Sequence, residues 1–141
     1  MDAANLIQIA LFDGLSDAQL KQISGWADEI DVDTGYHLIR RDGFGYEFFA
    51  IIDGTAEVMD GERHLADLSA GDFFGEMALI NRRPRGADVI AIAYCRLLVL
   101  SREPFRRFLR THPELMRRVR AVAVERARAL RPEGELDAAP A

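Results

Sequence analysis

The chain has 141 residues, of which 49% are hydrophobic and 29% charged, a balance typical of a soluble globular domain with its own core. No apolar run approaches the ~20 residues that a membrane-spanning helix needs, and residues 1–5 lack the basic start of a secretion signal. Cys95 is the only cysteine, which excludes an internal disulfide. We therefore expect a cytoplasmic protein in which Cys95 is a buried strand residue.

The net charge of −5 is unevenly distributed along the chain. Residues 1–95 carry 7 basic and 17 acidic side chains, whereas residues 96–141 carry 11 arginines and 6 acidic side chains. A basic half can bind nucleic acid, but these arginines are interleaved with Glu103, Glu114 and Glu125, and no groove-reading motif accompanies them. We expect a solvated, arginine-rich helix face and no DNA binding by this chain alone.

The first 26 residues predict helices. Residues 5–10 form a short helical segment, and Ser16 followed by Gln19 is a capping-box pattern for a helix that extends to about Trp26. We predict a packing role for Trp26, because no neighbouring residue suggests that its ring stacks on a ligand.

From residue 29 the pattern changes to short alternating or apolar runs separated by turn residues, which is typical of a barrel or a double-sheet roll. Asp53-Gly54 predicts a tight hairpin turn that pairs the runs on either side of it, and Asp60-Gly61 predicts a second one. The predicted strands are residues 30–33, 37–40, 47–52, 55–59, 63–68, 89–93 and 96–100.

Helical periodicity returns after residue 100. Ser101 takes the N-cap position of a helix to about Arg110, and Pro113 begins a final helix to about Leu130. The tail that follows contains Pro132, Gly134 and Pro140 and is expected to be flexible. The final helix carries an apolar stripe made of Leu115, Val119 and Val122, with Met116 and Ala123 beside it.

Residues 71–89 carry the chemistry of the chain. Gly75 precedes good helix formers, and the free backbone N–H groups at a helix start attract an anion. Arg85, on a loop anchored by Pro84, would complete a phosphate clamp. Glu76 in the same segment is out of place beside an anion unless its carboxylate accepts hydrogen bonds from sugar hydroxyl groups.

The run Phe74-Gly75-Glu76-Met77-Ala78-Leu79, followed by Pro84-Arg85-Gly86-Ala87, resembles the phosphate-binding cassette of cyclic nucleotide-binding domains. That family includes catabolite activator proteins, kinase regulatory subunits and cyclic nucleotide-gated channels. The resemblance covers roughly residues 6–130 and also includes residues 11–16 and 48–58. It implies a mainly β fold: an eight-stranded, jelly-roll-like double-sheet β-roll with N-terminal helices and C-terminal lid helices. The domain would span residues 1–131, and residues 132–141 would be a flexible tail.

The resemblance also implies roles for single residues. Arg85 would pair with the cyclic phosphate of cyclic AMP or cyclic GMP, Glu76 would accept a hydrogen bond from the ribose 2′-hydroxyl, and the last helix would close over the base. The other expected ligand-binding residues are Phe74, Gly75, Met77, Ala78, Gly86 and Ala87 in the cassette and Val58 and Leu65 in the apolar wall, to which Met77 also contributes.

Two residues depart from the family pattern. Gly86 follows Arg85 where many relatives have a hydroxyl residue, and Asp88 stands where a small polar residue is commoner. If Asp88 faced the pocket, its charge would oppose the phosphate; if it faced solvent, it would matter little. The alternative is therefore a non-catalytic interaction module with a vestigial pocket that forms a homodimer through the last helix. A third alternative is a DNA-binding regulator, in which a helix-turn-helix follows the last helix. In this sequence proline- and alanine-rich residues follow Leu130, so we expect no DNA reader within this chain, which leaves open a module of a longer protein.

We predict a regulatory sensor and not an enzyme. No serine, cysteine or histidine lies in a nucleophile motif, and the resemblance implies no cofactor beyond the nucleotide ligand. His37, His64 and His112 lack the paired spacing of histidine metal sites, so we predict no metal site and interpret all three as structural or surface residues. Arg82 and Arg83 are expected to be exposed turn residues.

Overall fold

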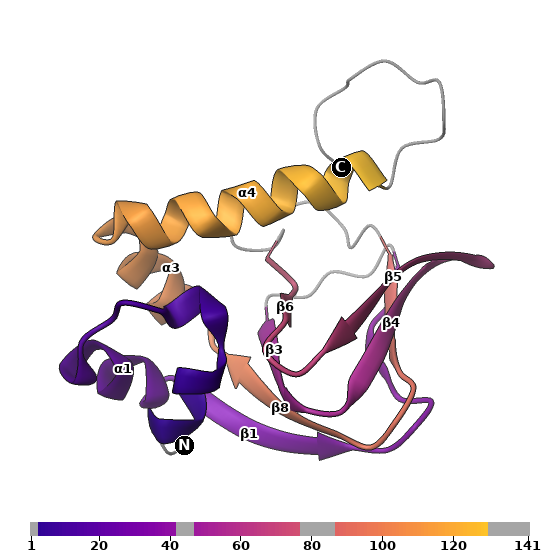
Figure 1. Ribbon diagram of the computed structural model, residues 1–141, viewed down its shortest axis with the longest axis horizontal. Coiled ribbons are helices and arrows are strands. Elements are labelled where there is room, and N and C mark those ends of the chain that lie inside the picture. Colours follow the sequence, from indigo (N-terminus) through magenta and orange to yellow (C-terminus); the bar gives the residue numbers. More distant parts are fainter. Residues whose placement is uncertain (1–2, 42–46, 77–86, 130–141) are drawn as a thin grey trace.

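The structure is a computed structural model that describes residues 3–41, 47–76 and 87–129. Its helices are the 3-10 helices η1 (Ala3–Gln8) and η2 (Ala10–Phe12) and the α-helices α1 (Asp17–Ser24), α3 (Arg102–Arg110) and α4 (Pro113–Ala129). Its strands are β1 (Ala27–Val32), β2 (His37–Ile39), β3 (Phe48–Asp53), β4 (Thr55–Asp60), β5 (Arg63–Ser69), β6 (Phe73–Phe74), β7 (Asp88–Ala91) and β8 (Cys95–Leu100). The strands form one end of the molecule, the N-terminal helices and α3 the other, and α4 runs between the two ends (Figure 1).

The strands form two antiparallel four-stranded sheets, in the orders β1-β8-β3-β6 and β2-β7-β4-β5. This confirms the prediction of a mainly β, double-sheet roll with flanking helices. The sequence did not indicate β6, in which Phe73 and Phe74 pair with Ala50 and Phe49 of β3. A strand of two residues is too short to show the alternation by which strands are recognised.

The prediction that Asp53-Gly54 forms a hairpin is wrong. β3 pairs with β6 and β8, whereas β4 pairs with β5 and β7, so these two residues form a corner between the sheets. Gly54 has a φ of 102°, and a Cβ atom there would lie 2.5 Å from the backbone oxygen of Tyr94. The glycine is needed because another segment of backbone approaches it closely. The Asp60-Gly61 turn does join a hairpin, that of β4 and β5.

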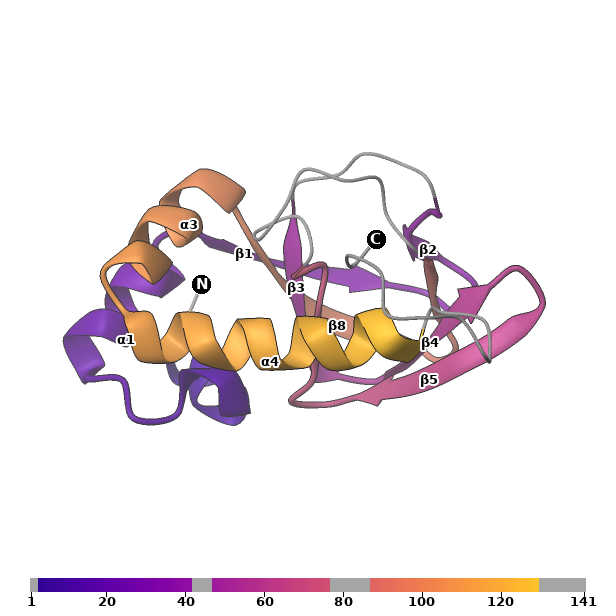
Figure 2. The ribbon, with the colours of Figure 1, turned by 90° about the horizontal axis from the view of Figure 1, so that it is seen from above.

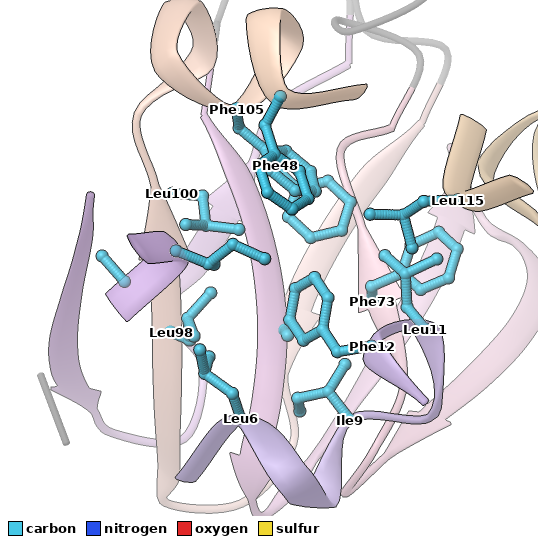
Figure 3. Packing of buried hydrophobic residues seen from close by; sticks show 14 of the residues in the cluster. Leu6, Ile9, Leu11, Phe12, Phe48, Phe73, Leu98, Leu100, Phe105 and Leu115 are labelled. Carbon is cyan, nitrogen blue, oxygen red and sulfur yellow. The ribbon is translucent and has the colours of Figure 1, made fainter. Parts of the chain in front are cut away.

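The two central strands of the first sheet, β3 and β8, are covered on both faces. Phe48 and Leu98 belong to a core shared with the helices, whereas Ile51 and Leu97 belong to a second core inside the roll. Successive side chains of a strand point to opposite faces of the sheet, so each strand supplies both cores in alternation. Figure 3 shows Phe48, Leu98 and Leu100 packed together with Phe105 of α3 and with three residues of the N-terminal segment: Leu6, Ile9 and Phe12.

The helix boundaries follow local signals. At α1, the Ser16 hydroxyl accepts a hydrogen bond from the backbone N–H of Gln19, and the Gln19 side chain accepts one from the backbone N–H of Ser16, which confirms the capping box. The helix ends at Ser24, earlier than predicted. Trp26 packs edge-on against Phe108, with 5.7 Å between the ring centroids, which confirms its packing role. Ser101 holds the N-cap position of α3 without a side-chain cap.

The apolar stripe of α4 is covered by the protein itself. Leu115 and Val119 are buried in the core shared with the N-terminal helices, and Met116 and Val122 pack partly buried against it. Arg118 on the same helix donates through Nη1 to the carbonyl oxygens of Leu11 and Asp13, at 3.0 and 2.7 Å. The expectation of a solvated arginine face is therefore only partly correct.

Among the described residues, no helix is both long and apolar enough to cross a membrane.

Candidate ligand-binding site

Glu76 is unusual among the described residues of the predicted cassette. Gly75, which follows β6, has a φ of 84°, a region that favours glycine, and turns the chain at this point. Glu76 comes next and is only 3% exposed, and within residues 3–41, 47–76 and 87–129 it is the one charged residue that is buried. A buried carboxylate is costly unless hydrogen-bond donors satisfy it.

The donor is Arg126, near the end of α4. Its Nη1 donates to Oε2 of Glu76 at 2.8 Å, and its Nη2 donates to the carbonyl oxygen of Phe73 at 2.6 Å. The guanidinium carbon also lies 5.2 Å from the centroid of the Phe73 ring, within the range of a cation–π contact. Three contacts therefore fix the guanidinium and hold the second half of α4 against the beginning of the cassette. Figure 2 shows α4 extending from the helical end of the molecule over the strands.

Sequence reasoning missed Arg126, which it grouped with the solvated arginines. A signal was present in the spacing along the helix. Ala123 comes four residues after the buried Val119, and Arg126 comes three residues after Ala123, so Arg126 continues the buried stripe. An arginine on a buried stripe requires an acceptor. The acceptor is 50 positions away in the sequence, so the pattern predicts the need for a partner but does not identify it.

The structure describes some of the other predicted site residues. Phe74 is buried inside the roll and stacks on Phe49 at 5.0 Å between centroids, and Val58 packs partly buried against the same core. Leu65 is half-buried on β5, and Ala87 is half-buried just before β7. Four further candidates lie outside the described residues: Met77, Ala78, Arg85 and Gly86. The ligand-binding roles of all the candidates stay predictions. The expected turn residues Arg82 and Arg83 lie there too.

Asp88 points away from the interior of the roll. Its neighbour Val89 is buried inside the roll, and neighbouring strand residues face opposite sides. The Asp88 carboxylate instead accepts a hydrogen bond from the backbone N–H of Arg41, at 2.8 Å. Of the two alternatives left open by the sequence, the one in which Asp88 opposes a bound phosphate is not supported.

Cys95 is fully buried at the start of β8, as predicted. Its thiol donates to the backbone oxygens of Thr55 and Ala93, at 3.1 and 3.3 Å. Burial raises the pKa of the Cys95 thiol above its ordinary value. A thiol that holds its proton is a weak nucleophile, so Cys95 has a structural role.

Comparison with known proteins identifies the family of this fold. A family model described as "Cyclic nucleotide-binding domain" matches residues 29–112. A cAMP-dependent protein kinase regulatory subunit of Mycosarcoma maydis is 37% identical over 113 residues, which cover 74% of this chain and 22% of that protein. The chain spans 22–28% of the length of three such curated relatives.

Solved structures share the fold. One described as Sp-2Cl-cAMPS bound to PKAR CBD2 has a TM-score of 0.79 and 24% identity, and the match covers 96% of this chain and 90% of that chain. The regulatory domain of Toxoplasma gondii PKA, solved with cAMP, has a TM-score of 0.73 and 26% identity, over 89% of this chain and 48% of that chain. Since the family model covers more than half of the residues and the two-sheet roll agrees with it, the chain belongs to the cyclic nucleotide-binding domain family.

Proposed function

We propose that this chain is a regulatory sensor module that binds cyclic AMP or cyclic GMP, with the ribose of the nucleotide at Glu76. The observation that carries the proposal is a carboxylate that is 3% exposed at the start of the cassette. A carboxylate only accepts hydrogen bonds, so ribose hydroxyl groups can donate to it, whereas an ionised phosphate has no donor to offer. A sugar phosphate is therefore a better ligand than inorganic phosphate. The relatives described above support the choice of a cyclic nucleotide.

The Glu76–Arg126 pair is compatible with a bound ribose. An ionised carboxylate has two oxygens, which together accept about four hydrogen bonds, and Arg126 is bonded to Oε2. A ribose hydroxyl could donate to the same carboxylate without displacing the arginine. The ligand and α4 would then share one acceptor, and occupancy of the site would favour the position of the helix seen here.

Arg85 is expected to supply the contact with the phosphate. A charge-assisted hydrogen bond contributes about 1.5–3 kcal/mol net, whereas micromolar affinity requires about 8 kcal/mol. Arg85 therefore accounts for only part of the binding free energy. The backbone N–H groups of the cassette and the apolar wall that includes Val58 would have to provide the rest.

The test is calorimetric titration of the chain with cyclic AMP and with cyclic GMP, with 5′-AMP as a control for the cyclic phosphate. We expect saturable binding of at least one cyclic nucleotide, and an Arg85→Ala variant that loses most of it. Arg82→Ala, a change of the same size and charge in the same segment, should bind like the wild type. Absence of both heat and a shift in melting temperature at millimolar ligand would refute the proposal.

The described part of the last helix offers little exposed apolar surface for the alternative, a homodimer through this helix. Leu115 and Val119 are covered by the protein's own core, and on the described part of α4 the only large apolar side chain that is exposed is Val124, at 45%. Light scattering tests this alternative. If the chain forms a dimer whether or not nucleotide is added, and calorimetry shows no nucleotide binding, the interaction module is favoured instead.

The proposed sensor module is cytoplasmic. In this proposal it catalyses no reaction, binds no DNA and does not insert into a membrane.

A further inference from the structure

Three potential metal ligands meet on the outer face of the second sheet. They are Glu57 of β4 and His64 and Asp67 of β5, and one ligand atom from each lies within 4.8 Å of the other two. Nε2 of His64 lies 2.8 Å from Oδ1 of Asp67. The His64 and Asp67 side chains are 48% and 72% exposed, so the group is open to solvent.

A β-bulge brings the group together. Val58 pairs with Ala66 and Met59 pairs with His64, so Leu65 has no partner residue on β4. In a regular strand, residues three positions apart lie on opposite faces of the sheet. The extra residue in β5 reverses the alternation and puts His64 on the same face as Asp67.

The two carboxylates of the group face each other across the strand pair, and His64 is at ion-pair distance from one of them. Glu57 and Asp67 are direct cross-strand partners, and like charges in this arrangement destabilise a sheet. A divalent cation between them would remove the repulsion, and the imidazole of His64 would add a nitrogen ligand. The sequence alone does not show this arrangement, because it depends on the register between β4 and β5.

We propose that Glu57, His64 and Asp67 form a binding site for a divalent transition-metal ion, with Zn²⁺ as the fitting occupant. One imidazole nitrogen and two carboxylate oxygens, with water in the fourth position, are a ligand set that Zn²⁺ accepts, whereas Ca²⁺ requires six to eight oxygens. At Zn²⁺ bond lengths, tetrahedral ligand atoms lie about 3.3 Å apart. Small side-chain rotations would widen the 2.8 Å separation of His64 and Asp67 and bring the other ligand atoms, which lie within 4.8 Å, to that spacing.

His37 provides a matched control. It pairs with Ile90 of β7, which also pairs with Glu57, so His37 lies in the same row of the same sheet as Glu57 but two strands away. Two strand spacings are about 9–10 Å, and His37 is not in the group of side chains whose ligand atoms lie within 4.8 Å of one another. Its replacement removes a histidine from this sheet without touching the proposed site.

The experiment is calorimetric titration of the metal-free chain with ZnCl₂, in the wild type and in His64→Gln, His37→Gln, Glu57→Gln and Asp67→Asn variants. We expect one Zn²⁺ per chain, affinity more than about tenfold weaker in the three site variants, wild-type affinity in His37→Gln, and no binding of MgCl₂. Zn²⁺ should also raise the melting temperature of the wild type but not of His64→Gln.

Either of two results would overturn the proposal. One is no saturable Zn²⁺ binding by the wild type. The other is wild-type affinity in any of the three site variants, once circular dichroism has shown that the variant is folded. Neither readout involves a nucleotide, so the result is independent of the proposed sensor function.

Discussion

Replacement of Arg126 by methionine should destabilise the protein substantially. The change removes the guanidinium but keeps an unbranched side chain that can still lie along Phe73. It leaves Glu76, whose side chain is 4% exposed, without the donor seen in the structure. Breaking a fully buried ion pair costs about 3–5 kcal/mol. Because the Arg126 side chain is 32% exposed, water screens the pair in part, and we expect a loss of about 2–3 kcal/mol.

Urea denaturation and thermal melting would measure this loss. A decrease of this size in the free energy of unfolding corresponds to a fall in Tm of about 5–12 °C for a domain of this length. Arg128→Met is the matched control: Arg128 is exposed on the last turn of the same helix, and we expect its replacement to change stability by less than about 0.5 kcal/mol.

A double-mutant cycle with Glu76→Gln separates the ion pair from other effects. Each single change breaks the pair, so the double variant should lose less stability than the sum of the two single losses, by more than about 1 kcal/mol. If the losses add within about 0.5 kcal/mol, or if Arg128→Met costs as much as Arg126→Met, the assignment of Arg126 as the partner of Glu76 is wrong.

Three further predictions concern the scaffold. Gly54→Ala should lower the free energy of unfolding, measured by urea denaturation, by more than about 3 kcal/mol, because a Cβ there lies 2.5 Å from a backbone oxygen. Gly61→Ala, at positive φ but in open space, should lower it by about 1 kcal/mol. Equal losses would contradict the close approach. Ser16→Ala should lower the free energy of unfolding by about 1 kcal/mol and Ser101→Ala by less than about 0.5 kcal/mol, because of these two residues only Ser16 makes a side-chain cap. A larger loss for Ser101→Ala would contradict this difference between the two caps. Burial raises the pKa of the Cys95 thiol in the folded state, so as pH rises past about 9 the unfolded chain loses a proton that the folded chain keeps. Wild-type stability should then fall by up to about 1.4 kcal/mol per pH unit relative to Cys95→Ala, and parallel pH profiles of the two proteins would contradict the shift.

The sequence was a good guide to elements and a poor guide to pairing. Turn residues and periodicity located the strands and helices because those signals are local. The Asp53-Gly54 turn was assigned to a hairpin because the dipeptide is typical of one. The choice between hairpin and corner depends on where β8 lies, which no local pattern contains.

The same limit applies to the site. The cassette candidates could be proposed because they are adjacent in the sequence, and their binding roles stay predictions. For Glu76 the sequence predicted hydroxyl donors of a ribose, and the donor that the structure shows is Arg126. Arg126 was not found, because the partner of a buried charge is determined by helix packing across 50 positions. The bulge at Leu65 could not be predicted either, since it exists only relative to the register of β4.

The double burial of β3 and β8 has a consequence for how the domain opens. Each of these strands packs one face against the core shared with the helices and the other face against the core inside the roll. Opening either core therefore exposes one face of both strands to water and weakens the other core. The helices and the roll should therefore melt as a single cooperative unit, with the amides of β3 and β8 the slowest to exchange with solvent. A slip of one residue in either strand would send each side chain into the wrong core, so the register is doubly enforced. Whatever stabilises the roll will therefore also protect the helices.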